Sequence, residues 1–359
     1  MRQRVLIALV ALLLLAAVGG GLWWWRASSA SELARAAALA PADAERLSWT
    51  DWSGVRRELD ADLSGSSSAA ELGRFLDRGF DADLTSTSAL LASAPVLQTR
   101  FGFSPATVEW ELFSQSSEGA VVILRLPDSA DFEALEANLT DLGYAPPSES
   151  EGGVWAVGDG LAAAGPDLTP ELQNVVLLAD EHLVLTSDTA AYLEEAAAGV
   201  AGSGGSGGSG DSGDLEGGLA DVVGPTGSAL SASVYGGDYA CSALAMGQAD
   251  ETDQEQAASL VAEAGEVNPV DGFSMSVQPD RRVRVVMAFE TEDQARTNAD
   301  TRAALAAGPA PGQGGDFGDR FSVDSVSADG RLVTMELVPE DGAYVLSDLS
   351  TGPVLFATC

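Results

Sequence analysis

The chain has 359 residues, 46% of them hydrophobic, so it is long enough to form two globular domains with apolar cores. Its 54 Asp and Glu residues face only 18 basic residues, all of them arginine, and the formal net charge is −36. This balance excludes nucleic acid as a partner, because binding to phosphates needs a basic face. The stretch from Leu126 to Asp280 has 28 acidic residues and no arginine. We interpret it as a solvated acidic surface, with a docking face for a basic partner as the alternative.

The N-terminus contains a long apolar run. Residues 5–25 carry no charge, two arginines precede them, and Arg26 follows. At about 1.5 Å per residue the run spans roughly 30 Å, the thickness of a bilayer core. The excess of positive charge before the run places the N-terminus in the cytoplasm. We therefore predict a cytoplasmic tip and transmembrane anchor over residues 1–26, embedded in the lipid bilayer through residues 5–25.

A cleaved signal peptide is the alternative interpretation of the same run. Its apolar region would extend from Val5 to Val18, and the small residues near Gly19 would form the cleavage site. Both interpretations export the body of the protein. The predicted location is the cell membrane, with a single span and the bulk of the chain extracytoplasmic.

Residues 27–41 are predicted to form a helical or flexible stalk. Two helices are expected after it. The first extends from about Thr50 to Leu59, because Trp52 and Val55 lie at helical spacing. The second covers about residues 69–80.

The loop between these helices, residues 60–71 (DADLSGSSSAAE), fits two templates. Five residues match the template of a calcium-binding loop, namely Asp60, Asp62, Ser64, Gly65 and Glu71. However, Ser67 stands where an apolar residue is usual, and no second loop of this pattern follows. Ser68 and Glu71 also match a capping box, in which each side chain binds a backbone N–H of the other residue. We predict the capped helix and keep the calcium-responsive loop as an alternative.

From residue 107 onward, a unit of two alternating strands and a helix occurs five times. The strand pairs cover residues 108–126, 174–187, 228–246, 272–289 and 320–338, and the helices that follow them cover 131–143, 188–199, 253–265, 292–308 and 342–352. Capping boxes are predicted at Thr252 with Glu255 and at Thr291 with Gln294. The predicted helix stops are Gly199, Gly265 and Gly308.

Residues 199–219 are rich in Gly and Ser, and such a stretch behaves as a flexible linker. It separates a first extracytoplasmic domain, residues 42–198, from a second, residues 220–359. Successive hairpin-plus-helix units predict an α+β fold in each domain, with antiparallel sheets and helices on one face. We expect the two halves to be related to each other.

The two cysteines, Cys241 and Cys359, are the only site residues that we assign. An even number of cysteines in an exported chain predicts a disulfide. No catalytic, cofactor-binding or metal-binding residues are predicted, and no cofactor. The chain has no lysine for a Schiff base, and its single histidine, His182, is expected in a hairpin turn.

The segments WTDWSGVRREL (residues 49–59) and DADLTSTSALLASAPVLQ (residues 81–98), with the hairpins after them, resemble a group of membrane-anchored extracytoplasmic proteins of GC-rich Gram-positive bacteria. The resemblance covers mainly residues 42–198 and implies a location, not an activity. Our prediction is a non-enzymatic binding or scaffolding protein of the cell envelope, with an envelope protein or glycan as partner. A hydrolase that uses two carboxylates is the alternative, so enzymatic activity stays an open question.

Overall fold

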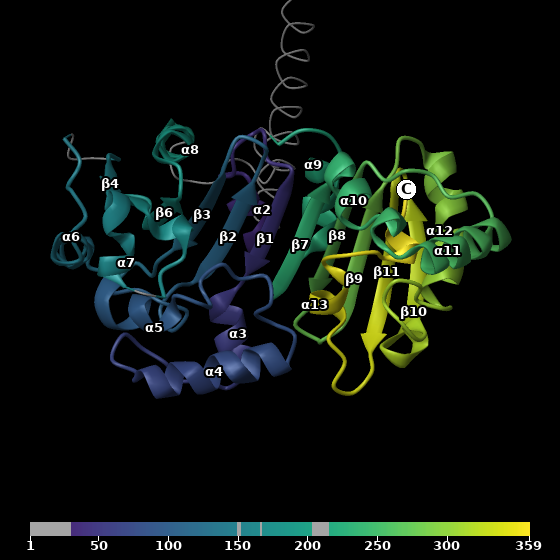
Figure 1. Cartoon of the computed structure of the whole chain (residues 1–359), viewed down its shortest axis with the longest axis horizontal. Coiled ribbons are helices and arrows are strands. Elements are labelled where there is room, and N and C mark those ends of the chain that lie inside the picture. The colour runs from purple at the N-terminus through teal and green to yellow at the C-terminus, as the bar shows by residue number, and fades with distance from the viewer. Residues whose placement is uncertain (1–29, 149–151, 166, 203–214) are drawn as a thin grey trace, which may run out of the picture.

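The computed structural model describes residues 30–148, 152–165, 167–202 and 215–359 (Figure 1). Its central feature is one sheet of eleven strands in the order β10-β11-β9-β8-β7-β1-β2-β3-β6-β5-β4. Every neighbouring pair is antiparallel. The predicted α+β class with antiparallel pairing is therefore confirmed, but the strands of both halves belong to a single sheet.

The strands are β1 (Arg46–Thr50), β2 (Trp110–Gln115), β3 (Ala120–Arg125), β4 (Val154–Ala156), β5 (Asn174–Leu178), β6 (Leu183–Ser187), β7 (Ser231–Gly236), β8 (Gly272–Val277), β9 (Val283–Ala288), β10 (Phe321–Asp329) and β11 (Leu332–Pro339). The α-helices are α2 (Glu32–Ala37), α3 (Trp52–Glu58), α4 (Ala69–Asp81), α5 (Ala94–Val96), α6 (Phe132–Asp141), α7 (Leu161–Ala164), α8 (Ala190–Gly202), α9 (Gly217–Thr226), α10 (Gly237–Ala243), α11 (Glu251–Ala264), α12 (Glu292–Ala306) and α13 (Val345–Leu349).

The two halves of the chain join through β1 and β7, which lie side by side at the centre of the sheet (Figure 1). Ser48 is opposite Ser233 in this antiparallel pair. The indole Nε1 of Trp49 donates a hydrogen bond of 2.9 Å to the carbonyl oxygen of Ala229. We call this pairing the seam. It makes the sheet continuous, so the two halves share one structural layer.

Helices cover both faces of the sheet, and the prediction that they lie on one face is wrong. One apolar cluster contains residues of α3 to α7 and α10 to α13, and a second contains residues of α2, α8 and α9. The reason is visible in β3, where Val122 packs into the first cluster and Val121 and Ile123 into the second. A strand that is apolar on both sides needs cover on both sides.

The segment predicted as a helical or flexible stalk contains helix α2, and this helix packs against the fold. Leu33, Ala36 and Ala37 are at most 1% exposed and belong to the second cluster. The helix predicted to begin near Thr50 is preceded by strand β1, and α3 begins only at Trp52. Asp51 caps α3 by accepting a hydrogen bond of 2.7 Å from the backbone N–H of Gly54.

Four of the five repeated units form the predicted hairpins, and the third does not. In residues 228–246, the second strand is replaced by helix α10. A Cβ on Gly237 would lie 2.5 Å from the carbonyl oxygen of Val270, so the two backbones approach too closely for a side chain. After β7 the chain leaves the sheet, and α10 places Cys241 next to Cys359, the last residue of the chain.

The predicted helix boundaries are partly confirmed. The capping boxes of Ser68 with Glu71 and of Thr291 with Gln294 are both present. Helix α11 is capped by Asp250 instead of Thr252, because the Asp250 carboxylate accepts from the N–H of Asp253.

The predicted helix stops have different outcomes. Gly265 ends α11 with φ of +119°. Gly308 lies one residue beyond Ala307, the C-cap of α12. Helix α8 continues past Gly199 to Gly202, and α9 begins at Gly217, so the linker predicted over residues 199–219 is helical at both ends. Its middle, residues 203–214, lies outside the described residues.

The predicted transmembrane run, residues 5–25, also lies outside the described residues. None of the helices in the described ranges has the length and apolar character needed to cross a bilayer. The anchor and the domain boundaries stay predictions.

Candidate functional site

Cys241 and Cys359 form the predicted disulfide. Their Cα atoms are 5.5 Å apart, and the bond closes a loop between residues separated by 118 positions. No cysteine is left free. The bond ties α10 to the last residue of the chain.

The calcium-type loop has the geometry of a helix cap. Glu71 Oε2 accepts a hydrogen bond of 2.8 Å from the backbone N–H of Ser68, and Ser68 Oγ accepts one of 3.2 Å from the N–H of Glu71. The bond from the Ser68 N–H, and a further one that Ser68 Oγ donates to the same Glu71 oxygen, lower the pKa of the Glu71 carboxyl. Within the described ranges, no group of three or more His, Cys, Asp and Glu residues is placed to hold a metal ion. The Glu71 carboxylate caps the first turn of α4.

Glu111 on β2 is a buried carboxylate that the sequence did not single out. It is 1% exposed and lies beneath α3. Its Oε2 accepts hydrogen bonds from the indole Nε1 of Trp52 at 2.9 Å and from Ser88 Oγ at 2.7 Å, and its Oε1 accepts one from the N–H of Ala89 at 2.6 Å. Burial raises its pKa to about 6, although these donors oppose the shift. All of its bonds serve to hold α3 and the segment after α4 on the sheet.

We expect Glu111 to make stability depend on pH. Its pKa is higher in the folded chain than in the unfolded chain, so the folded state holds the proton more tightly. The resulting stabilisation is complete below pH ~4.5 and is lost as the pH rises through ~6, a change of about 2 kcal/mol in the free energy of unfolding. Urea denaturation from acidic to neutral pH should show this fall for the wild type and a flatter profile for Glu111→Gln.

Glu109→Gln is the control for this measurement, because it removes a carboxylate that is 42% exposed and lies just before the same strand. Asp83, described below, contributes in the same direction in every variant. Profiles of equal slope for the wild type and Glu111→Gln would contradict the prediction.

The clearest candidate site is a groove formed by both halves on one side of the seam. It has a volume of about 330 Å³. The first half supplies the end of α4 and the residues just after it, and the second half supplies the β8–β9 turn and the segment between β11 and α13. We call it the junction groove, and its lining residues are Asp81, Ala82, Asp83, Val277, Asp280, Arg281, Arg282, Val283, Val338, Pro339, Glu340, Asp341, Gly342 and Ala343.

Asp83 links the two halves at this groove. Its carboxylate accepts hydrogen bonds from the backbone N–H groups of Leu346 and Ser347 in α13, at 2.6 and 3.0 Å. Asp83 itself has φ of +58° and is 6% exposed. Burial raises its pKa to about 6, against the effect of the two backbone donors. A side chain of the first half thus caps a helix of the second.

Further contacts cross the junction beside Asp83. The rings of Phe80 and Tyr344 lie 5.5 Å apart between centroids. Arg281 donates to the carbonyl oxygen of Ala82 at 3.3 Å and lies 3.5 Å from the carboxylate of Glu58. The end of α4 is therefore fixed against the second half by polar and aromatic contacts.

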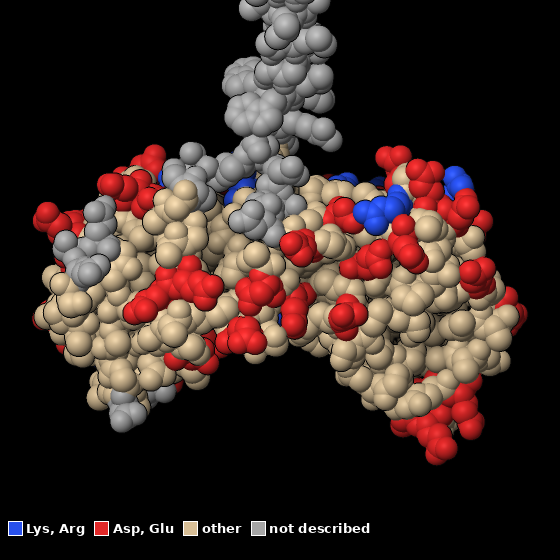
Figure 2. Space-filling view, turned by 90° about the horizontal axis from the view of Figure 1, so that it is seen from above, with Lys and Arg blue, Asp and Glu red and all other residues tan. Residues whose placement is uncertain are grey.

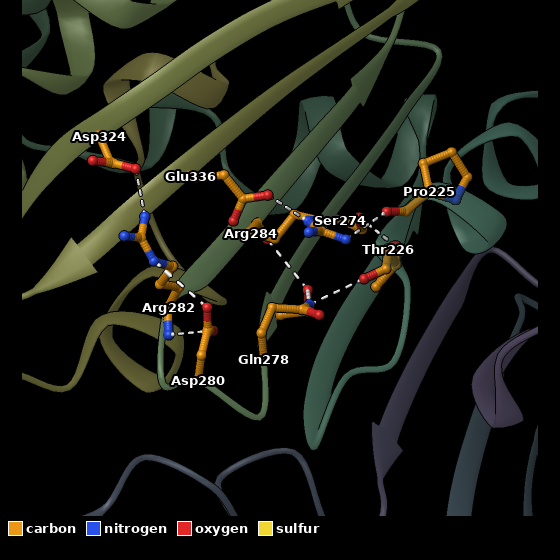
Figure 3. A network of polar contacts seen from close by, with 10 residues as sticks. Pro225, Thr226, Ser274, Gln278, Asp280, Arg282, Arg284, Asp324 and Glu336 are labelled. Carbon is orange, nitrogen blue, oxygen red and sulfur yellow. Dashed lines mark hydrogen bonds and ion pairs between the residues drawn. The ribbon is translucent and has the colours of Figure 1, made fainter.

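Arg282 is held within the second half. Figure 3 shows its guanidinium between the carboxylates of Asp280 and Asp324. Strand β9 begins directly after Arg282. On this strand, Arg284 Nε donates a hydrogen bond of 2.6 Å to Glu336 on β11. The positive charges at this end of β9 are therefore neutralised by the protein itself.

A larger groove, of about 740 Å³, lies beside α8 and is formed by the first half alone. Its polar residues include Asp43, Glu118 and Glu195, and the Tyr192 hydroxyl donates to Asp43 at 3.2 Å. Figure 2 shows Asp and Glu scattered over the face seen from above, with few Arg among them. An acidic lining is thus common on this protein and does not by itself mark a site.

The structure places the residues singled out from the sequence in three separate regions. The disulfide lies at the C-terminus, the 60–71 loop precedes α4, and His182 lies in the β5–β6 turn as expected. The junction groove was missed. Its only signal in the sequence is the polar segment 81–86.

Comparison with known proteins adds no relative. No protein-family model, no curated protein sequence and no solved structure matches the chain. Function is therefore argued from the geometry.

Proposed function

We propose that this protein is a single-pass, membrane-anchored extracytoplasmic protein that acts by binding or scaffolding in the cell envelope. The observation that carries the proposal is the junction groove, which both halves build and which exposes apolar side chains beside charged ones. The two carboxylates whose pKa is raised to about 6, Glu111 and Asp83, accept hydrogen bonds from donors of the fold itself. This favours binding over catalysis.

The disulfide supports the proposed extracytoplasmic location. A disulfide is stable in oxidising compartments outside the cytoplasm. Helix α2 packs onto the sheet, so only residues 26–31 separate the expected span from the folded body. Six residues reach at most about 20 Å when fully extended. The body would therefore lie close to the membrane surface.

We also propose that the two halves arose from one ancestral unit. Outward from the seam, the order β7-β8-β9-β11-β10 in the second half repeats the order β1-β2-β3-β6-β5 in the first. Helix α9 precedes β7 as α2 precedes β1, and these two helices contact each other. A binding site at the boundary between two such halves is a common arrangement, because clefts form where units meet.

A carboxylate-dependent hydrolase is the second candidate. Asp83 favours it, because an acid with a pKa of about 6 in a groove with other carboxylates suits general acid–base chemistry. Incubation of the full-length protein with cell-wall glycan and envelope peptides, beside Asp83→Asn, decides between them. If the wild type turns over one of these substrates and Asp83→Asn does not, the protein is a hydrolase and the binding proposal is wrong.

Location and binding are tested in cells. The full-length protein should fractionate with membranes, be digested by protease added to intact cells, and resist thiol alkylation until it is reduced. Crosslinking in intact cells should then recover a defined envelope protein or glycan. Full-length protein in the cytosol with both thiols alkylated before reduction would overturn the proposal.

A further inference from the structure

Exposed apolar side chains lie in the junction groove and directly beside its lining residues. Within the described residues, Phe80 and Val338 are the only large hydrophobic side chains that are exposed, at 51% and 37%. Val338 lines the groove, and Phe80 immediately precedes Asp81 and Ala82, which also line it. Phe80 comes from the first half and Val338 from the second. One exposed apolar side chain in the groove and another next to its lining residues indicate a contact surface, since exposed apolar groups are otherwise scattered.

The charge of the side chains that line the groove favours a basic partner. Its lining contains five carboxylates and two guanidinium groups. Both guanidinium groups already have carboxylate partners, Arg281 with Glu58 and Arg282 with Asp324. In contrast, the side chains of Asp81, Glu340 and Asp341 make no ion pair or hydrogen bond with any other described residue. The unpaired charge at the groove is negative.

We propose that the junction groove docks a basic protein segment that places an apolar side chain against Phe80 and Val338 and its Lys or Arg beside the unpaired carboxylates. This inference rests on the proposed binding function and names its partner. The volume of about 330 Å³ is near the lower limit of ligand sites, so it accommodates a few side chains of an extended segment.

Two other occupants of such a surface, a second copy of the chain and a membrane, complement the negative charge of the groove less well. A second copy of this chain would bring another net charge of −36 to the groove. An anionic membrane surface would be repelled by the same carboxylates. A basic segment gains both from burial of apolar area and from charge complementarity.

The test uses the full-length protein in nanodiscs of zwitterionic lipid, with empty nanodiscs as the blank. The probe is a short fluorescein-labelled peptide of alternating lysine and leucine, measured by fluorescence anisotropy. Matched peptides of lysine with serine and of glutamate with leucine separate the contributions of charge and apolar contact. We expect the lysine–leucine peptide to bind most tightly, and its affinity to fall as salt is raised.

Two pairs of substitutions test the groove itself. Phe80→Ser with Val338→Ser should weaken binding of the lysine–leucine peptide by about tenfold, since both lost side chains are anchors of the contact. Glu340→Gln with Asp341→Asn should reduce the salt dependence. Glu251→Gln with Glu255→Gln removes the same charge from the exposed face of α11, away from the groove, and should leave affinity unchanged.

Equal binding of the lysine–leucine and lysine–serine peptides, or no effect of the Phe80 and Val338 pair, would overturn the proposal. So would self-association of the wild type, seen in sedimentation, that Phe80→Ser abolishes, because the occupant would then be a second copy. If crosslinking in cells recovers the same envelope partner from the Phe80 and Val338 variant, the groove assignment fails while the binding function stands. Loss of that partner in this variant alone supports both.

Discussion

Arg302→Met is expected to lower the free energy of unfolding by roughly 3 to 5 kcal/mol, because it breaks a buried charged network. Arg302 on α12 is 0% exposed. Its guanidinium donates to the carbonyl oxygens of Phe356 and Thr358 at 2.8 and 2.9 Å and to that of Asn268, and Nε donates to Asn298 Oδ1 at 3.0 Å. No carboxylate is within ion-pair distance of it among the described residues, and burial lowers its pKa to about 9.

The loss would come from the carbonyl groups that remain buried without a donor. Chemical denaturation at neutral pH measures it. Arg296→Met is the matched control on the same helix. Arg296 is 62% exposed and, among the residues that the structure describes, forms ion pairs only with the exposed carboxylates of Glu292 and Asp293. That change should cost less than about 1 kcal/mol. Similar losses for the two variants would show that the buried network contributes little.

Removal of the disulfide, by Cys241→Ser with Cys359→Ser, is expected to lower the free energy of unfolding by about 4 to 5 kcal/mol. The bond closes a loop between residues 118 positions apart, and most of its effect is to restrict the unfolded chain. Denaturation of the wild type with and without a reducing agent, beside the double variant, measures it. Reduction should lower the stability of the wild type to that of the variant and leave the variant unchanged.

The disulfide and Arg302 hold the same segment. Arg302 binds the carbonyl oxygens of Phe356 and Thr358, and Cys359 follows directly. The losses of unfolding free energy should therefore be less than additive. Once one change has released the C-terminal segment, the second change removes a contact that no longer stabilises the folded state. Full additivity in the combined variant would indicate that the segment stays docked when either link is broken.

Local chemistry made parts of the fold predictable from the sequence. Ser68 and Glu71 are three residues apart and satisfy each other's backbone groups, so no distant residue is needed to form that cap. The hairpin β10–β11 follows from two alternating segments around a short turn, which the structure forms with Gly330 and Arg331 between Asp329 and Leu332. The disulfide was predictable because two cysteines allow only one intramolecular pairing.

The candidate site was not predictable in this way. Asp83 meets Leu346 and Ser347 across more than half the chain, and no pattern near residue 83 indicates which helix its carboxylate will cap. Phe80 looks like one more apolar residue of an amphipathic helix, yet it is 51% exposed and contacts Tyr344. A groove between two halves exists only once their relative placement is fixed.

The sequence by itself determined the α+β class, most of the hairpins, the caps of α4 and α12 and the disulfide, since each depends on neighbouring residues or on a count of cysteines. Only the tertiary structure decided that β1 pairs with β7, that α2 packs onto the sheet, and that helices cover both faces. The alternation of a strand specifies which side chains share a face but not which strand supplies the next hydrogen bonds. That choice is made by the edge groups that remain unpaired and the apolar surface that must still be buried.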